Sequence, residues 1–176
     1  MPVNYEFKAR VKDIEDKEKM LLELKPNFIG EDNQRDTYYN VDRGRLKLRE
    51  GNIENALIYY ERHDVAGSKI SEVVLYEHRP DDDLKSILEK VHGVKVVINK
   101  KRRIYFLENV KFHFDSVEGL GTFIEVEAID KTGTAEHTTI KAQCDKYAAF
   151  FEIGQEDYVS QSYSDLLLNP LTDAHE

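Results

Sequence analysis

Charged residues alternate with apolar residues along several segments of this chain, in the pattern of β-strands that carry one charged face. Residues 4–8 read NYEFK, residues 45–49 read RLKLR, and residues 123–127 read FIEVE. Side chains two positions apart on a strand point to the same face. The apolar faces need a core of their own. A sheet built from these strands therefore has to turn its charged faces either to solvent or into the interior of a barrel.

The composition narrows the class of protein. The chain has 176 residues and a formal net charge of −9, which predicts one domain and argues against general nucleic-acid binding, because that normally needs a basic surface. Cys144 is the single cysteine, so the sequence excludes an intrachain disulfide and a cysteine-based zinc site. No apolar run reaches membrane-spanning length and no signal peptide opens the chain, so we expect a cytoplasmic protein without a membrane partner.

Turn signals divide the chain into short strands with a few helices. Helices are predicted over residues 13–25, 80–93 and 134–151, each from an apolar stripe at helical spacing. A short apolar segment, residues 163–168, is expected to close the fold. Strands are predicted over residues 3–10, 34–41, 45–50, 56–63, 69–77, 94–106, 110–117 and 122–129.

About eight strands with short connections predict an antiparallel sheet. An even-numbered antiparallel set can close into a barrel, which removes the exposed edges. We therefore expect an α+β fold, namely a closed antiparallel eight-stranded β-barrel, or tunnel, with helices packed outside. Residues 1–168 form this single domain, and residues 169–176 are expected to be a flexible tail.

The charged faces have two interpretations. On any single strand, a solvent-exposed face is the more common outcome for charged residues. However, the pattern recurs on strands that should be neighbours, which favours charges that converge inside the barrel. Buried charges have to be paired or bind a ligand. Arg and Lys suit phosphate oxygens, and grouped carboxylates suit Mg²⁺ or Mn²⁺, so the mixture predicts a site for a polyphosphate with a divalent metal.

Several motifs of the chain resemble one family. The resemblance covers nearly the whole chain, and its most specific part is residues 113–127, which read HFDSVEGLGTFIEVE. The other matching segments are residues 34–39, 44–49, 60–62, 101–103 and 162–167. Together they resemble the CYTH superfamily, the triphosphate tunnel metalloenzymes, and residues 113–127 look most like class IV adenylyl cyclases.

The resemblance implies roles for individual residues. It implies catalytic roles for Lys8, Asp115 and Arg103, and metal ligation by Glu6, Glu125, Glu127 and Asp115 with Mg²⁺ or Mn²⁺ as the cofactor. It implies that the substrate-binding residues are Lys8, Arg45, Lys47, Arg49, Arg62, Lys101 and Arg103.

One departure from the family pattern concerns the metal. The first-strand signature is Glu-x-Glu-x-Lys, and this chain has Asn4 where the first Glu stands, followed by Glu6 and Lys8. An amide carbonyl can ligate a hard cation but brings no negative charge, so we expect weaker binding of one metal.

Four functions remain open at this point. The first is a class IV adenylyl cyclase-like enzyme that converts ATP to cyclic AMP and pyrophosphate. The second is a triphosphatase that acts on inorganic, nucleoside or thiamine triphosphate, and the third is a noncatalytic module that binds a phosphorylated ligand. A structural protein with a charged surface is the fourth. The expected partner is ATP or another triphosphate, and the sequence does not distinguish a monomer from a homodimer.

Overall fold

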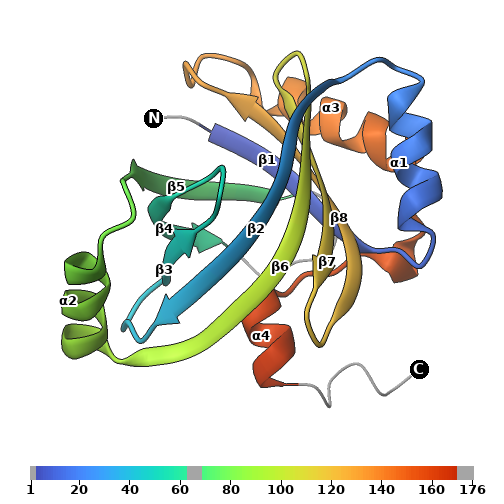
Figure 1. Ribbon diagram of the computed structural model, residues 1–176. Helices are drawn as coiled ribbons and strands as arrows, with labels where there is room; N and C mark the ends of the chain where they lie inside the picture. Colours follow the sequence, from blue (N-terminus) through green and yellow to red (C-terminus); the bar gives the residue numbers. More distant parts are fainter. Residues whose placement is uncertain (1–2, 63–68, 170–176) are drawn as a thin grey trace.

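The computed structural model describes residues 3–62 and 69–169, and Figure 1 shows a curled sheet with helices on its outside. The predicted α+β class is confirmed. Within the described part of the chain no helix is both long and apolar enough to cross a membrane. The elements are β1 (Val3–Arg10), α1 (Ile14–Leu22), β2 (Asn27–Tyr39), β3 (Arg45–Glu50), β4 (Ala56–Arg62), β5 (Lys69–Glu77), α2 (Asp82–His92), β6 (Val94–Leu107), β7 (Val110–Val117), β8 (Gly121–Asp130), α3 (His137–Phe150), a 3₁₀ turn (Gln155–Asp157) and α4 (Tyr163–Leu168).

The eight strands form an antiparallel sheet in the order β1-β5-β4-β3-β2-β6-β7-β8. β1 pairs along its whole length with β8, and the described residues include three pairs between β1 and β5. Further along β1, residues of the C-terminal segment contact its edge. Ala9 forms a bridge with Tyr158, and the Val159 N–H donates to the Lys8 carbonyl at 2.9 Å. The predicted strand number, strand direction and curl are confirmed, whereas a barrel closed by strands along its full length is not.

The helices cover the apolar outer face of the sheet, as predicted. α1 and α3 enclose a core whose centre is Phe7, Phe112 and Ile124, all buried, with Cys144 of α3 in the same cluster. At the other end of the molecule, Leu88 of α2 clusters with Leu48 on the outer face of β3. These contacts bury the apolar faces, which leaves the charged faces of the same strands to line the inside.

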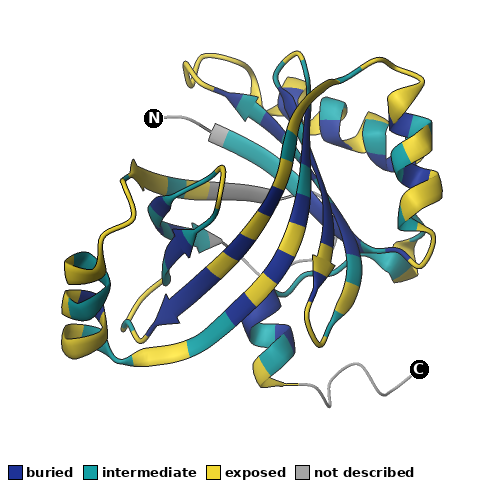
Figure 2. Cartoon of the chain, viewed as in Figure 1, coloured by how far each residue is buried: buried dark blue, intermediate teal, exposed yellow. Residues whose placement is uncertain are grey.

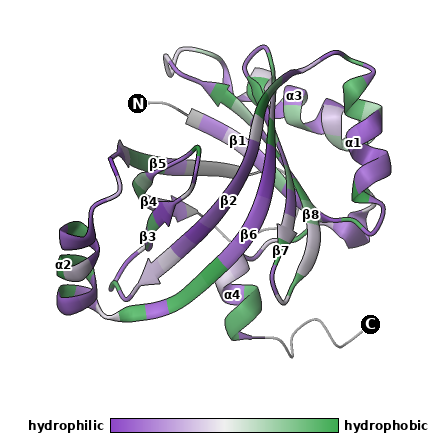
Figure 3. Cartoon of the chain, viewed as in Figure 1, coloured by the Kyte–Doolittle hydropathy of each residue, from purple (hydrophilic) through white to green (hydrophobic). Residues whose placement is uncertain are grey.

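The largest difference from the predicted elements is the length of β2. It begins at Asn27 rather than at residue 34, and pairs with β6 over most of its length. Figure 2 shows buried and exposed residues alternating along it, and Figure 3 shows that consecutive residues in its middle are hydrophilic. Glu31, Asp32 and Asn33 are all polar, although only Asp32 is buried. Their hydropathy therefore shows no alternation that would predict a strand here.

The C-terminal segment blocks one end of the interior. The expected closing segment is the helix α4, preceded by Ser162 as its N-cap. Tyr163 and Leu166 of α4 lie in an inner apolar cluster with Phe123 and Ile98. The predicted flexible tail, residues 169–176, lies outside the described part of the chain from residue 170 onward.

Candidate functional site: a charged cavity inside the curled sheet

A cavity of about 140 Å³ lies on the inner face of the sheet and is lined mostly by charged side chains. Its carboxylates include three of the four predicted metal ligands, Glu6, Glu125 and Glu127, but not the fourth, Asp115. Grooves of larger volume exist on the surface, but none of them collects charges from so many strands. The cations that line this cavity are Lys8, Lys47, Arg49, Lys100, Arg102 and Lys111.

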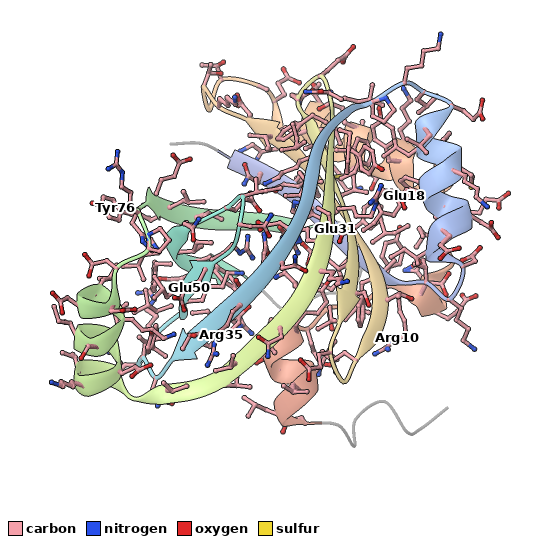
Figure 4. The ribbon with its side chains drawn as sticks, viewed as in Figure 1. Arg10, Glu18, Glu31, Arg35, Glu50 and Tyr76 are labelled. Carbon is pink, nitrogen blue, oxygen red and sulfur yellow. The ribbon has the colours of Figure 1, made fainter. Side chains whose placement is uncertain are left out.

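β6 carries its two inner cations one position earlier than predicted. Lys100 and Arg102 line the cavity, whereas Lys101 is exposed on the outer face. Arg103 also lies outside, where its Nε donates to Glu18 of α1 at 2.5 Å. Figure 4 labels Glu18 on the side of α1 that faces the sheet. Lys101 and Arg103, which were predicted to bind the substrate, therefore do not line this cavity. Four consecutive cations place two on each face of a strand, so alternation alone could not identify the inner pair.

Asp36 is the anion around which three cavity cations gather. Arg49 donates to its two oxygens at 2.9 and 2.8 Å, and Lys100 Nζ lies 2.9 Å from Oδ2. Lys47 Nζ is 3.5 Å from the same oxygen. Burial alone would raise the pKa of Asp36, but these cations hold it well below its usual value. The group stays ionised and holds its cations in fixed positions at the cavity wall.

Lys100 is the cation whose charge is most affected by its surroundings. It is buried, and burial together with the nearby Arg102 lowers its pKa to about 7, although Asp36 opposes this shift. Because this pKa lies near neutral pH, an anion close to the Lys100 amine favours its protonated, charged form.

Asp115 forms an ion pair with Arg102 in this structure. Its two oxygens accept from Arg102 at 2.7 and 2.6 Å, and the Tyr163 hydroxyl donates to Oδ2 at 2.7 Å. Burial raises the pKa of Tyr163 well above its usual value, and the Asp115 charge adds to that effect. Asp115 is fully buried behind the cavity wall, with both oxygens occupied by side chains of this chain.

The three predicted metal ligands that line the cavity lie on two neighbouring strands. Glu6 of β1 is paired in register with Glu127 of β8, and Lys8 with Glu125. Glu125 is 3.4 Å from Lys8 Nζ and 3.4 Å from His113 Nδ1. Burial would raise the pKa of Glu125, but Lys8 and Arg102 hold it well below its usual value. Glu127 differs, because burial and the neighbouring Glu6 raise its pKa to about 7.

Asn4 joins this carboxylate pair. Its side-chain Nδ2 donates to Glu127 Oε1, and its Oδ1 is buried with no hydrogen-bond partner among the described residues. The oxygens of Glu6, Glu127 and Asn4 are the hard donors that Mg²⁺ and Mn²⁺ prefer. Two adjacent carboxylates with an orphaned amide oxygen fit a divalent cation. Within residues 3–62 and 69–169, however, no three His, Cys, Asp or Glu side chains already converge in metal-binding geometry.

The remaining predicted residues lie at the edges of the site. Arg45 pairs with Asp165 of α4 at 2.6 Å, and it does not line the cavity. The Arg62 side chain lies outside the described part of the structure. Two lining residues that the sequence analysis missed are Glu54, from the β3–β4 connection, and Lys111. Lys111 could have been found, because it stands two positions before His113 on a strand with the same alternation.

Comparisons with known proteins place this geometry in a family. The family described as CYTH domain matches residues 3–157. A protein of Methanocaldococcus jannaschii named "Putative adenylate cyclase MJ0240" is 32% identical over 137 residues, which cover 69% of this chain and 75% of that protein. The PH1012 protein of Pyrococcus horikoshii has a solved structure with a TM-score of 0.79 and 25% identity, covering 93% of this chain and 98% of that one. A Hippeastrum protein described as a "putative adenylyl cyclase" with a dominant triphosphatase activity has a TM-score of 0.63 and 13% identity, covering 97% and 96%.

Proposed function

Since the chain belongs to the CYTH domain family, we propose that it is a divalent-metal-dependent enzyme that processes triphosphates in the cavity of its curled sheet. The observation that carries this proposal is the gathering of six cations from four strands around one small cavity, with three carboxylates on its β1–β8 wall. A triphosphate carries several negative charges, and a desolvated cluster of Arg and Lys donors recognises such an anion. The C-terminal segment completes the wall beside β1, so the curled sheet works as a tunnel.

The metal, Mg²⁺ or Mn²⁺, would be held by Glu6, Glu125 and Glu127, with Asn4 Oδ1 as a neutral donor. When bound, it supplies positive charge that polarises the phosphorus centre and neutralises the leaving oxygens. Asn4 already orients Glu127 through its hydrogen bond. Asp115 takes no part in ligation in this proposal, because both of its oxygens are engaged by Arg102 and Tyr163.

The chain's own cations bind and orient the triphosphate. Arg102, held by Asp115, and Arg49, held by Asp36, are pre-positioned donors that require no reorganisation when charge develops on the phosphate oxygens. Lys8 and Lys100 add point charges near the Tyr163 ring, with Nζ atoms 3.9 and 5.5 Å from its centroid. In phosphoryl chemistry, positioning and electrostatics of this kind supply most of the catalysis.

The cyclase reaction is our first assignment. In it the ribose 3′-hydroxyl of ATP attacks the α-phosphorus, which gives cyclic AMP and pyrophosphate. One wall of the cavity supports a substrate that carries a base and sugar, because Ile58, Val73 and Leu75 line it beside Tyr60. An inorganic triphosphate has no apolar part that would use such a wall. The Methanocaldococcus relative, whose name refers to an adenylate cyclase, points the same way.

A triphosphatase is the second candidate, and the size of the cavity favours it. At about 140 Å³ the cavity is smaller than the roughly 300–1,000 Å³ of typical sites for organic ligands. It suits a triphosphate group better than a whole nucleotide. In this reaction water attacks the terminal phosphorus and releases phosphate, an activity that the description of the Hippeastrum protein also names. A noncatalytic binding module is the third candidate and rests on Asn4, which reduces the negative charge available to a metal.

The test is a product analysis. The protein is incubated with ATP, and separately with inorganic tripolyphosphate, in Mg²⁺ or Mn²⁺ from neutral to alkaline pH, and the products are separated. Cyclic AMP with pyrophosphate would establish the cyclase, and orthophosphate without cyclic AMP would establish the triphosphatase. A Glu127→Gln variant purified in parallel controls for contaminating enzymes. If no product forms although both compounds bind, the enzyme assignment is refuted in favour of the binding module.

A further inference from the structure

The connection between β3 and β4, residues 51–55, is pinned to the mouth of the cavity by a buried carboxylate. Asp32 of β2 accepts the backbone N–H groups of Ile53 and Glu54, each at 2.9 Å. Gly51 lies so close that a Cβ there would stand 2.5 Å from Asp32 Oδ1. Asp32 is completely buried, so this part of the connection is held in one position.

The pinned connection places the Glu54 carboxylate among the cations of the cavity. Its Oε2 lies 2.6 Å from Lys111 Nζ, and its Oε1 lies 3.6 Å from Arg49. Gln34 Nε2 donates to the same Oε1 at 2.9 Å and to Asp32 at 2.8 Å, which ties the carboxylate to its anchor. Burial would raise the pKa of Glu54, but Lys111 and Arg49 hold it well below its usual value, so the group is an anion.

Glu54 lies on a loop, whereas Asp36 and Asp115 lie on strands. Asp36 and Asp115 project from strands and are almost fully buried beside the Arg that each one holds. The Glu54 side chain stands on a loop and keeps 26% of its surface exposed. It can therefore leave its cations without disturbing the sheet.

We propose that Glu54 is a built-in counter-anion that occupies one end of the polyphosphate path, so that it sets both the affinity for triphosphates and the length of chain that the cavity accepts. This inference rests on the proposed triphosphate site. Phosphate oxygens at that end need Lys111 and Arg49, the same cations that Glu54 engages, and two anions cannot share them without repulsion. A ligand must displace the Glu54 carboxylate or stop short of it.

Two consequences follow for variants. Replacing Glu54 with Gln removes the competing charge but keeps the shape, so tripolyphosphate should bind about tenfold more tightly, a change of about 1.4 kcal/mol. The same variant should accept inorganic tetraphosphate, which the native chain should bind more weakly than tripolyphosphate. Gly51→Ala leaves the charge of Glu54 unchanged but forces the connection away from Asp32, and it should shift both affinities in the same direction.

The experiment is calorimetric titration of the full chain with tripolyphosphate and with tetraphosphate, in a buffer that contains a metal chelator. Glu61→Gln is the matched control, because Glu61 lies on the outer face of β4 and contacts Tyr59 and Arg43 only at the surface. We expect tighter binding by Glu54→Gln and by Gly51→Ala, and unchanged binding by Glu61→Gln. If Glu54→Gln does not fold, the affinity of Gly51→Ala for tripolyphosphate still tests the proposal.

The outcomes separate this inference from the proposed function. If the native chain binds tripolyphosphate and Glu54→Gln binds it equally or more weakly, the counter-anion role is refuted while the triphosphate site stands. If the native chain and all three variants bind neither polyphosphate, and still bind neither when Mg²⁺ replaces the chelator, the proposed function fails and the inference falls with it.

Discussion

Lys100 and Lys101 are adjacent residues on opposite faces of β6, so they offer a direct test of the assigned inner face. Lys100 lines the cavity, with its Nζ 2.9 Å from Asp36, whereas Lys101 is exposed outside. Replacing either one by Met removes a charge and keeps an unbranched side chain of similar length. Lys100→Met should weaken tripolyphosphate binding, and Lys101→Met should leave it unchanged.

The size of the effect follows from the kind of contact that is lost. A hydrogen bond to a charged group contributes about 1.5–3 kcal/mol, so Lys100→Met should weaken binding by about 10- to 150-fold at pH 6. Asp36 keeps both of its hydrogen bonds from Arg49 in this variant, so the fold should survive. At pH 6 the amine is charged in the free protein, because its pKa of about 7 lies above that pH.

The effect should shrink as the pH rises. Above pH 7 the Lys100 amine is neutral in the free protein and has to take up a proton when the phosphate binds. Well above the pKa each further pH unit costs about 1.4 kcal/mol, so the ratio of the variant to native dissociation constants should fall about fivefold between pH 7 and pH 8, where half of the amine is already neutral at the start. The sign for stability is opposite: since burial lowers the pKa of Lys100 from 10.5 to about 7, the unfolded chain binds more protons between these values. This group therefore makes the native protein more stable as the pH rises through that window.

Calorimetric titration from pH 6 to pH 8.5 measures these quantities, and the ratio cancels the titration of the ligand itself. An equal loss of affinity in Lys101→Met would show that the inner face of β6 is assigned wrongly. A ratio that does not change with pH would refute the proposed state of the Lys100 amine.

Three further changes test other parts of the site. Asp36→Asn should destabilise the fold by about 3–5 kcal/mol, because it removes the charge that pairs with the buried Arg49; for a chain of this size that lowers the melting temperature by about 6–20 °C, and a shift below 2 °C would contradict it. Glu127→Gln should abolish metal-dependent turnover while circular dichroism stays native, since it relieves repulsion with Glu6, and full activity would refute the metal assignment. Asn4→Glu should enlarge the rise in melting temperature that Mn²⁺ produces, because it adds a third charge beside that pair, and an unchanged response would remove Asn4 from the metal site.

The sequence predicted a strand correctly where all residues on one of its faces are of the same kind. In residues 45–50 every inner residue is a cation and every outer one is Leu or Glu, so both the strand and its inner face follow from alternation. The start of β2 was not predictable, because residues 31–34 are polar on both faces: Glu31 and Asn33 are exposed, whereas Asp32 and Gln34 are buried and hydrogen-bonded to each other. Only the pairing with β6 distinguishes them.

The site was predictable only for residues that share a motif or a strand face. Glu6, Glu125 and Glu127 line the cavity, and their strands alternate clearly enough for the sequence to put them on one inner face. Arg102 was missed by one position within a run of four cations. Glu54 carried no signal, because a loop residue reaches the cavity only through an anchor that lies 22 residues earlier in the chain.

The pairing of the cavity charges determines how a triphosphate can bind at all. Burying a cation without a partner costs several kcal/mol, and in the described part of the chain Arg49, Arg102 and Lys111 each have a carboxylate partner. Binding is thus an exchange of anions around cations that are already desolvated, and its free energy depends on which carboxylate gives way. Asp36 is locked by two bonds from Arg49, so it stays and keeps the donors in place, whereas Glu54 reaches its cations from a loop. The two carboxylates should therefore respond in opposite ways to neutralisation: the loss of Asp36 should cost stability, and the loss of Glu54 should increase affinity.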